Sequence, residues 1–475
     1  MRMKGAPTLS RRDFTRFSAA LVAGAVAPVP ARARAAVPPN ILFILADDLG
    51  YADLSCYGRP DYRTPHIDRL AAEGMRFTSA YSNSPVCSAT RTALITGRYQ
   101  YRLPIGLEEP LGARNIGLPP SHPTLPSLLR ARGYRTELIG KWHLGPLPDY
   151  GPNRSGYDHF WGFRAGGVDY FAHAIGGRHD LWDDDTEIHR TGYLTDLLGD
   201  KAVERVGALA ESERPFFLSL HFSAPHWPWE APSDEAVSRD LAASADPLRL
   251  LHFDGGTQKS YAAMVERLDY QVGRVLAALA RHRLARDTIV IFTSDNGGER
   301  FSYNWPFSGR KTELLVGGVR VPAIVRWPGR VARASLCDVP IMSMDWLPTL
   351  LGAAGTAADP ACPPDGVDLA SLLAGGGLDE RPLYWRYNLH GQRSVRLGKW
   401  KYLRIAGNEF LFDIEADPME RANLAARQPD RFAQMKAAWE QWNERMLPYD
   451  AQSNTHGFTG AELPERFGVT TAAGP

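Results

Sequence analysis

Two stretches of the chain share one design, and together they constrain the fold more than any other feature. "NILFILADDLG" (residues 40–50) and "TIVIFTSDNGG" (residues 288–298) each run from continuous apolar residues into acidic or amide side chains and then glycine. An uninterrupted apolar run of this kind is typical of a strand buried on both faces, as in a parallel sheet. Ligands gather at the carboxyl ends of such strands, so we expect the polar residues that end these runs to meet. They are Asp47, Asp48, Asp295 and Asn296.

These four residues form an all-oxygen set of the kind that binds a hard divalent cation such as Ca²⁺ or, as a weaker alternative, Mg²⁺. Each pair taken alone is explained equally well by a helix cap or a turn. Their position after two strands of the same design favours a metal site. The sequence has no thiolate and imidazole cluster with the spacing of a zinc site.

Cys87 opens a second candidate site, in "SPVCSATRTALITGRY" (residues 84–99). The pattern predicts a helix that begins near Cys87, where backbone N–H groups and the helix dipole favour negative charge. Arg91 lies one turn further on, where it can meet the same anion. The alternative is a small buried thiol beside a surface arginine, and this stretch alone does not separate the two.

Three loops carry further basic side chains. "GKWHLG" contains Lys141 and His143, which point to the same side if the segment is extended. His226 lies in the loop "SAPHWPWEAP", and Lys311 lies in "FSGRKTELLVGGVRVP". Isolated loop residues of these types are usually just solvated, but three cationic loops beside a divalent metal suit a bound tetrahedral anion.

The remaining pattern predicts an α/β fold with a large, mostly parallel mixed sheet flanked by helices. "TPHIDRLAAEGMRF" has Pro65 at a first helical position, and residues 259–284 place an apolar stripe on one helical face. From about residue 383 short aromatic-rich segments alternate, which predicts antiparallel strands, followed by a covering helix. We therefore predict a catalytic domain at 37–375 and a C-terminal subdomain at 376–475, with a small antiparallel sheet and a packing helix.

Residues 1–36 differ from the rest of the chain. They carry seven basic residues and one acid, and "SRRDFTRF" places paired arginines ahead of a short apolar stretch and the small residues "ARARAA". This pattern predicts a twin-arginine signal peptide, and hence a periplasmic or secreted protein; a basic tail or a membrane anchor is the alternative. The apolar stretch is too short and too broken by Gly and Pro to span a bilayer comfortably, so we expect no membrane span.

Charge and cysteine content exclude two other classes of protein. Without residues 1–36 the chain has 47 basic and 52 acidic residues, a net charge of −5, which argues against a nucleic-acid partner. Four cysteines are too few for a disulfide framework at this length. Cys337 and Cys362 are the nearest candidates for a single disulfide.

From Asn40 to Leu424 the chain resembles the type I sulfatases of the alkaline phosphatase superfamily. The motifs that carry the resemblance, in the order of that family, are "NILFILADDLG", "TPHIDRLAAEGMRF", "CSATRTALITGRY", "GKWHLG", "SAPHWPW", "YAAMVERLDYQVG", "FTSDNGG", "GRKTELLVGGVRVP" and "LFDIEADPMERANLA". In this family the motif cysteine is oxidised to Cα-formylglycine. The resemblance therefore implies that Cys87 is a precursor of an aldehyde, and that the enzyme is a sulfuric-ester hydrolase acting on sulfated carbohydrates or aryl sulfates.

The resemblance also implies a role for each site residue. Calcium would be held by Asp47, Asp48, Asp295 and Asn296, together with the modified Cys87. One hydroxyl of the hydrated aldehyde would attack the sulfur of the ester, with Arg91 and Lys141 polarising it and Lys311 neutralising sulfate oxygens. His226, with Lys311, would protonate the leaving alcohol, and His143 would take a proton from the second hydroxyl.

The motif departs from the family's commonest form because Ala89 and Thr90 stand where proline and serine are usual. In the family the alanine form is linked to an oxygen-independent radical maturase, which we expect as the modifying partner. Two further functions stay open on the sequence: a phosphate or phosphonate ester hydrolase on the same fold, and an unmodified, inactive binder of sulfated glycans. Trp227, Trp229 and residues 166–171 either stack on a sugar or aryl ring or pack their own loops.

Overall fold

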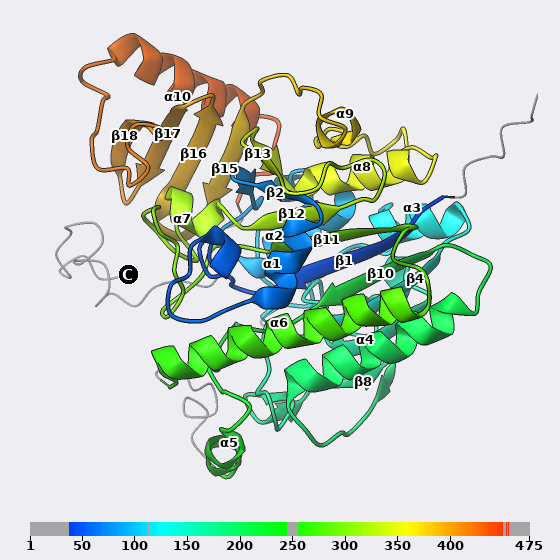
Figure 1. Cartoon of the computed structure of the whole chain (residues 1–475). Coiled ribbons are helices and arrows are strands. Elements are labelled where there is room, and N and C mark those ends of the chain that lie inside the picture. The colour runs from blue at the N-terminus through cyan, green and yellow to red at the C-terminus, as the bar shows by residue number, and fades with distance from the viewer. Residues whose placement is uncertain (1–37, 112–113, 245–254, 450–452, 454, 456–475) are drawn as a thin grey trace, which may run out of the picture. The chain divides into compact units, whose positions relative to one another are not determined.

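A ten-stranded sheet organises the computed structural model of the chain, with the strand order β13-β2-β12-β11-β1-β10-β4-β5-β8-β9 (Figure 1). The structure describes residues 38–111, 114–244, 255–449, 453 and 455. The five central strands are parallel. In spatial order they are β11 (Thr288–Ser294), β1 (Asn40–Ala46), β10 (Phe216–His221), β4 (Arg135–Lys141) and β5 (His159–Phe163).

Both edges of the sheet are antiparallel or mixed. Beyond β11, β12 and β2 each run antiparallel to the strand before, and β13 is parallel to β2. Beyond β5, β8 and β9 are antiparallel. The bounds are β12 (Ala323–Arg326), β2 (Met75–Phe77), β13 (Ser335–Cys337), β8 (Trp182–Asp183) and β9 (Thr186–Glu187). The predicted large, mostly parallel mixed sheet is confirmed.

Helices cover both faces of this sheet, which explains why β1 is apolar along its whole length. Leu42, Ile44 and Ala46 pack in the core beneath α1, α4 and α6, whereas Ile41, Phe43 and Leu45 pack on the opposite side with α2, α3 and α8. Figure 1 shows α4 and α6 side by side on the first face. The bounds are α1 (Pro65–Ala72), α2 (Cys87–Thr96), α3 (Leu125–Ala131), α4 (Leu194–Ala210), α6 (Gln258–Arg281) and α8 (Trp346–Ala353).

The C-terminal part forms a second, antiparallel sheet of four strands covered by a helix, as predicted. Its strands are β15 (Leu383–Tyr387), β16 (Gln392–Leu397), β17 (Trp400–Ile405) and β18 (Asn408–Asp413), and the helix is α10 (Pro429–Asn443). Buried Met435, Trp439 and Trp442 of α10 join the core of this sheet. That core also contains Ala89 and Ala93 of α2, so it continues across the predicted boundary at residue 375. The domain limits themselves stay a prediction.

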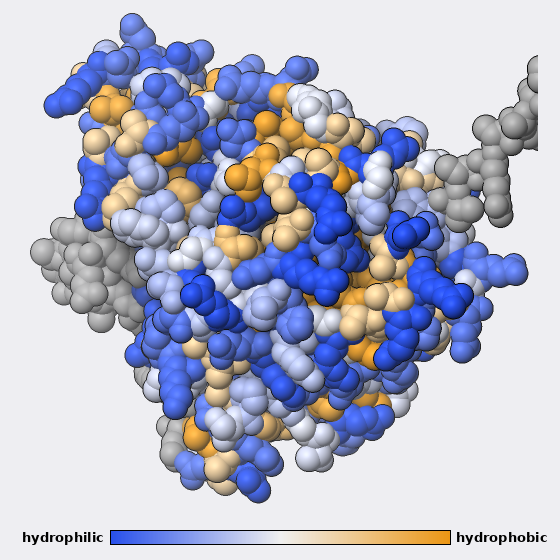
Figure 2. Space-filling model, in the orientation of Figure 1, coloured by the Kyte–Doolittle hydropathy of each residue, from blue (hydrophilic) through white to orange (hydrophobic). Residues whose placement is uncertain are grey.

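Short elements connect these layers. They are β3 (Ala80–Tyr81), β14 (Ile341–Met342), β6 (Ala174–Ile175), β7 (Arg178–His179), α5 (Glu235–Ala242), α7 (Val316–Val319) and α9 (Ala370–Leu373). The face shown in Figure 2 is mostly hydrophilic, with hydrophobic residues in small patches. Most large apolar side chains of the described residues are buried between the layers.

Three sequence predictions concern the ends and the cysteines. The predicted signal peptide at 1–36 lies outside the described residues. Among the described helices, none combines the length and the apolar character needed to cross a bilayer. Cys337 and Cys362 are both free thiols, so the structure does not contain the disulfide that we considered between them.

Candidate active site

The carboxyl ends of β1 and β11 bring the four predicted oxygen ligands together. The two strands pair in register up to Ala46 and Ser294, and the polar residues follow directly. The backbone N–H of Asp48 donates to Oδ1 of Asp295 (3.2 Å), and Nδ2 of Asn296 donates to Oδ1 of Asp48 (2.7 Å). Residues almost 250 positions apart thus share one buried cluster.

Two observations show that this cluster fits a divalent cation. Burial and the nearby Asp295 carboxylate raise the pKa of Asp47 to about 8, because so many acidic groups share a buried volume. The buried Oδ1 atom of Asn296 has no hydrogen-bond partner among the described residues. A hard cation would supply both the missing positive charge and a partner for this oxygen.

Cys87 is the first residue of α2 and is only 2% exposed. Its thiol donates to Oδ1 of Asp47 (3.2 Å) and lies 3.8 Å from Oδ1 of Asp48. Burial, and then the carboxylates of Asp295 and Asp47, raise the pKa of the thiol well above its ordinary value. The unmodified cysteine is therefore a protonated thiol and a poor nucleophile, whereas the expectation that the start of this helix favours a bound anion stays a prediction.

Arg91 is fully buried and binds a carboxylate of the cluster. Its Nε and Nη2 atoms donate to Oδ2 of Asp295 (3.1 and 2.8 Å), and Nη1 donates to the carbonyl oxygen of Lys141 (3.1 Å). Arg91 does not line the open cleft described below. Its observed contacts are therefore to the metal-ligand cluster rather than to the space where a substrate would lie.

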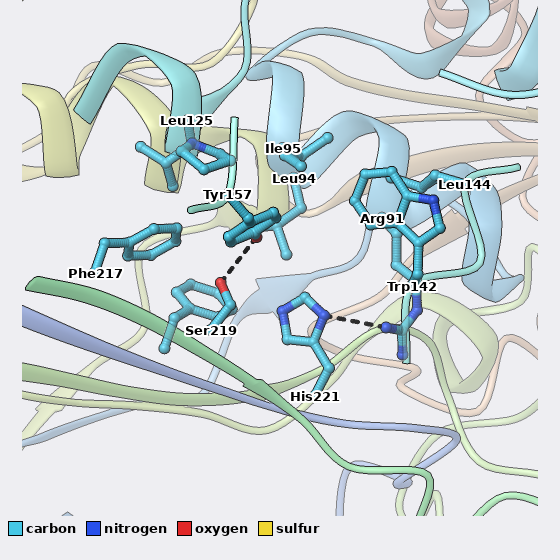
Figure 3. A pocket seen from close by; sticks show the side chains of 12 residues that line it. Arg91, Leu94, Ile95, Leu125, Trp142, Leu144, Tyr157, Phe217, Ser219 and His221 are labelled. Atoms are coloured by element: carbon cyan, nitrogen blue, oxygen red, sulfur yellow. Dashed lines mark hydrogen bonds between the residues drawn. The ribbon is translucent and has the colours of Figure 1, made fainter. Parts of the chain in front are cut away.

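A small, largely apolar cavity lies behind Arg91, and Figure 3 shows its lining. On one side of it Tyr157 donates to the hydroxyl of Ser219 (3.0 Å), and on the other Nδ1 of His221 lies 3.3 Å from Nη1 of Arg91. Burial, with Arg91, lowers the pKa of His221 to about 3. The same Nδ1 lies 3.2 Å from the carbonyl oxygen of Lys141, to which Arg91 also donates, so this histidine at the end of β10 packs beside the contact between Arg91 and Lys141.

Lys141 and His143 both reach the site, but not in the way that we predicted. Lys141 ends β4, is fully buried, and donates to Oδ2 of Asp47 (2.5 Å). The strand stops there, and His143 has a φ of +57°, so the segment is not extended at His143. The backbone N–H of His143 donates to the carbonyl oxygen of Arg164 (3.1 Å), which fixes this turn against the end of β5.

His143 is a buried histidine whose imidazole makes no hydrogen bond with any described residue through either ring nitrogen. Burial, and then the positive charges of Lys141 and Arg91, hold its pKa well below its ordinary value. Gly166 packs directly on the ring, because a Cβ at that position would lie 2.7 Å from Cε1 and Nε2 of His143. The ring is therefore neutral and held by packing, with its nitrogens free to exchange protons.

Lys311 and His226 form the opposite side of the cluster. Nζ of Lys311 donates to Oδ2 of Asp48 (2.7 Å) and lies 3.1 Å from Nε2 of His226. Burial opposes the charge on this lysine, but Asp48 and the further acidic groups around it, among them Glu299 and Asp47, together outweigh that effect and raise its pKa well above the ordinary value. Nδ1 of His226 lies 2.5 Å from the carbonyl oxygen of Trp227; a carbonyl only accepts, so Nδ1 carries a proton and Nε2 accepts from Lys311.

Three of the ten non-glycine residues with a positive φ in the described part of the chain lie at this site. Asp48, His143 and Thr312 have φ values of +59°, +57° and +70°, a region that residues with a Cβ seldom adopt. Asp48 is one of the four predicted oxygen ligands, His143 is a predicted site residue, and Thr312 directly follows Lys311. Strain of this kind is found preferentially where side chains must be held in place for function.

A cleft of about 670 Å³ opens above Cys87, and its lining includes His143, His226, Trp227 and Lys311. Trp227 thus borders the cleft. Trp229 does not: it is buried and packs edge-on against Phe301. Trp229 therefore packs its own loop, whereas Trp227 lies where it can contact a ligand in the cleft.

The C-terminal sheet holds the segment that carries Lys311. Nε2 of Gln392 in β16 donates to the carbonyl oxygen of Thr312 (2.8 Å), and Oε1 of Gln392 accepts from the N–H of Leu314 (2.7 Å). Lys401 of β17 donates to the carbonyl oxygen of Leu314 and to Glu420 (2.7 Å each). We call these contacts the C-terminal clamp; they fix the backbone beside an active-site lysine from about 80 residues away.

Sequence reasoning missed three kinds of residue at the site. His221 follows the same strand-end pattern as Asp47, and the apolar segment before it was the available signal. The paired glycines Gly166 and Gly167 pack on His143 and His226, and such a pair after a strand signals a close approach of backbone to a neighbour. Gln392 gave no signal, because its partners are distant in the sequence.

The fold and the site together define a hydrolase of the alkaline phosphatase-like type: a large mixed sheet with oxygen ligands, lysines and histidines at the carboxyl ends of its strands. Residues 39–356 match the family model described as Sulfatase. The chain therefore belongs to the sulfatase family.

The relatives agree with this assignment. The chain is 35% identical over 390 residues to N-acetylgalactosamine-6-sulfatase of Canis lupus familiaris, covering 77% of this chain and 71% of that protein. It is 32% identical over 433 residues to human arylsulfatase A, covering 82% and 80%. Among solved structures, that of Ps i-CgsB in complex with k-i-k-neocarrahexaose superposes with a TM-score of 0.79 at 29% identity, covering 90% of this chain and 97% of that one.

Proposed function

We propose that this protein hydrolyses sulfate monoesters of carbohydrates or aryl alcohols, with Cys87 acting as Cα-formylglycine beside a calcium ion. The observation that carries the proposal is the position of the Cys87 side chain. It lies at the base of the cleft, between the Lys141–Asp47 pair and the Lys311–Asp48 pair. A buried, protonated thiol has no evident use there, whereas an aldehyde hydrate would place its hydroxyl groups among these partners.

Charge at the site supports an anionic substrate together with a divalent cation. Three carboxylates, those of Asp47, Asp48 and Asp295, pair with Lys141, Lys311 and Arg91. With both histidines neutral and with Asp47 ionised, as a bound cation would keep it, the charges of these groups cancel. A sulfate ester anion entering such a buried cluster needs further positive charge, and a divalent cation held by the carboxylates, Asn296 and position 87 would neutralise the sulfate oxygens.

His143 is suited to take a proton from a hydroxyl at position 87. It is neutral because of its low pKa, it lines the cleft with Cys87, and neither ring nitrogen is occupied by a described residue. Lys141, charged and fixed on Asp47, keeps the local field positive, which favours loss of a proton from that hydroxyl.

Lys311 and His226 are suited to the leaving group. Both line the cleft, and Lys311 retains its proton because Asp48 stabilises the charge. An alkoxide that develops within reach of Nζ would be stabilised by this ammonium and protonated by it, either directly or through Nε2 of His226. Trp227, beside His226, borders the space that the alcohol would occupy.

The test combines mass spectrometry with turnover. Trypsin releases residues 77–91 as one peptide, and conversion of the thiol to an aldehyde lowers its mass; we expect the converted peptide in protein made with an active maturase. The same preparation should hydrolyse 4-nitrophenyl sulfate faster than 4-nitrophenyl phosphate. An intact thiol in protein with full sulfatase activity would refute the mechanism, and a preference for the phosphate would support the phosphate ester alternative.

Maturation and location complete the proposal. Ala89 supports modification by a radical maturase, which co-expression of this protein with each maturase type under anaerobic conditions would test.

The paired arginines at positions 11 and 12 support twin-arginine export to the periplasm. Replacement of both by lysine should retain the protein in the cytoplasmic fraction; unchanged export would contradict this route.

A further inference from the structure

The cleft above Cys87 has one strongly basic wall, formed where β5 ends and by the hairpin of β6 and β7. Arg164 follows β5, and Arg178 and His179 form β7; all three line the same cleft as Cys87, His143 and Lys311. None of the three is needed for the chemistry proposed above. Their position beside the reaction centre therefore calls for a separate explanation.

Arg164 is a buried cation with unused hydrogen-bonding capacity. Its side chain is 7% exposed, and Nε and Nη1 have no hydrogen-bond partner among the described residues. Only Nη2 is engaged, with the carbonyl oxygen of Asp184 (2.6 Å) and Asp185 (3.1 Å). Its guanidinium lies 4.3 Å from the ring centre of Trp182, another lining residue. Asp185 already pairs with this guanidinium, so the donors of Arg164 that are left for a ligand are Nε and Nη1.

Arg178 adds an exposed charge to the same wall. It forms no ion pair with any described residue, so its charge is available to a ligand in the cleft. His179 beside it is bonded to Glu187 (3.0 Å) and stacks on His189, which fixes this end of the hairpin. The wall thus combines a buried guanidinium with an exposed one.

The acidic groups near this wall are already engaged and leave Arg178 without an ion pair among the described residues. Asp180, the nearest in sequence, is buried, and its carboxylate accepts from the N–H groups of Arg164 (3.1 Å) and Ala165 (2.7 Å) and from Nε1 of Trp182 (2.6 Å). These donors occupy the oxygens of Asp180, Asp185 pairs with Arg164, and Glu187 is bonded to His179. Arg178, which forms no ion pair with a described residue, is therefore the charge on this wall that a ligand in the cleft would meet.

We propose that this wall is a subsite for a second anionic group of the substrate, a sulfate or a carboxylate next to the sulfate ester that is cleaved. The inference rests on the proposed function, because it makes the preferred substrate a polyanionic sulfated sugar rather than a simple aryl sulfate. Arg178, and the charge of Arg164 behind it, would bind the second anion while the scissile sulfate lies above position 87. Guanidinium groups suit both anions, since their paired N–H donors match sulfate and carboxylate oxygens.

The test measures binding separately from turnover. Calorimetric titrations with calcium present, in the inactive Cys87→Ala protein, would use three ligands: N-acetylgalactosamine 6-sulfate, its 4,6-disulfate, and a disaccharide that joins the 6-sulfated sugar to glucuronic acid. We expect at least one of the two dianionic ligands to bind about tenfold more tightly than the monosulfate. The ligand that does so shows whether the second anion is sulfate or carboxylate.

The variant Arg178→Ala should remove that preference and leave affinity for the monosulfate within about twofold. Arg333→Ala, which removes an exposed arginine outside the cleft, should change neither. Equal affinity for all three ligands, no binding of any, or an equal loss for all in Arg178→Ala would overturn the subsite. Selective binding by a protein that hydrolyses no sulfate ester would instead refute the proposed function and leave the subsite standing.

Discussion

Replacement of Gly166 by alanine should separate the proposed catalytic role of His143 from its contribution to stability. The new Cβ would lie 2.7 Å from Cε1 and Nε2 of the imidazole, whereas carbon atoms in ordinary contact are about 3.5–4.0 Å apart. The ring must therefore move by about 1 Å. Gly166 does not have a positive φ, so alanine introduces no backbone strain of its own.

The effect on activity should be large and the effect on stability small. A displacement of about 1 Å in a catalytic group can lower the rate about 100-fold, which corresponds to about 2.7 kcal/mol in the activation barrier. Overpacking costs about 1–3 kcal/mol of unfolding free energy. We expect the lower end of that range, because the imidazole of His143 has no hydrogen bond to a described residue that must break.

The assay is kcat/KM with 4-nitrophenyl sulfate, corrected for the fraction of formylglycine at position 87, together with thermal unfolding. Gly377→Ala is the matched control, because a Cβ there meets no atom within 4 Å and the backbone conformation is an ordinary one. Activity of Gly166→Ala within about twofold of wild type would refute the reasoning. A loss of activity that follows the loss of folded protein would refute it as well.

Three further outcomes can be checked. Cys87→Ala should lower kcat at least about a thousandfold with little change in the melting temperature, and substantial residual turnover would contradict a covalent role. In chelator, the folded protein should keep a proton on Asp47 (pKa raised to about 8) that the unfolded chain releases, so urea unfolding should show stability falling as pH rises from 4 to 8. The slope should approach about 1.4 kcal/mol per pH unit, and excess calcium should flatten it; a rise with pH would contradict this sign. Lys401→Met leaves the buried carboxylate of Glu420 unpaired, and should lower the unfolding free energy by about 3–5 kcal/mol, with Lys401→Met/Glu420→Gln recovering part of the loss in the same denaturation assay.

The cluster of oxygen ligands at the ends of β1 and β11 could be predicted because local sequence patterns define both strands. The apolar runs that end at Ala46 and Ser294 define two buried strands, and parallel pairing in register then brings the following polar residues to one edge of the sheet. The C-terminal sheet was predictable for a similar reason, since alternation and short turns are local signals. In both cases a short local stretch of sequence is enough to predict each strand.

Side-chain directions at the site could not be predicted in the same way. Arg91 points to Asp295, and the turn at His143 depends on a hydrogen bond to the carbonyl oxygen of Arg164. Both depend on partners supplied by other strands. The contacts of Gln392 with the Lys311 segment join residues about 80 positions apart, and no periodicity in the sequence indicates such a pairing.

The C-terminal clamp makes the small sheet an integral part of the active centre. A truncated enzyme that ends near residue 375 would retain all the proposed catalytic and metal-binding residues, yet it would lose Gln392 and Lys401, which fix the backbone next to Lys311. Exchange of this sheet between related sulfatases should therefore alter the position of Lys311, the group proposed to protonate the departing alcohol. Chimeras of this kind would offer a route to new leaving-group preferences without touching any residue that contacts the substrate.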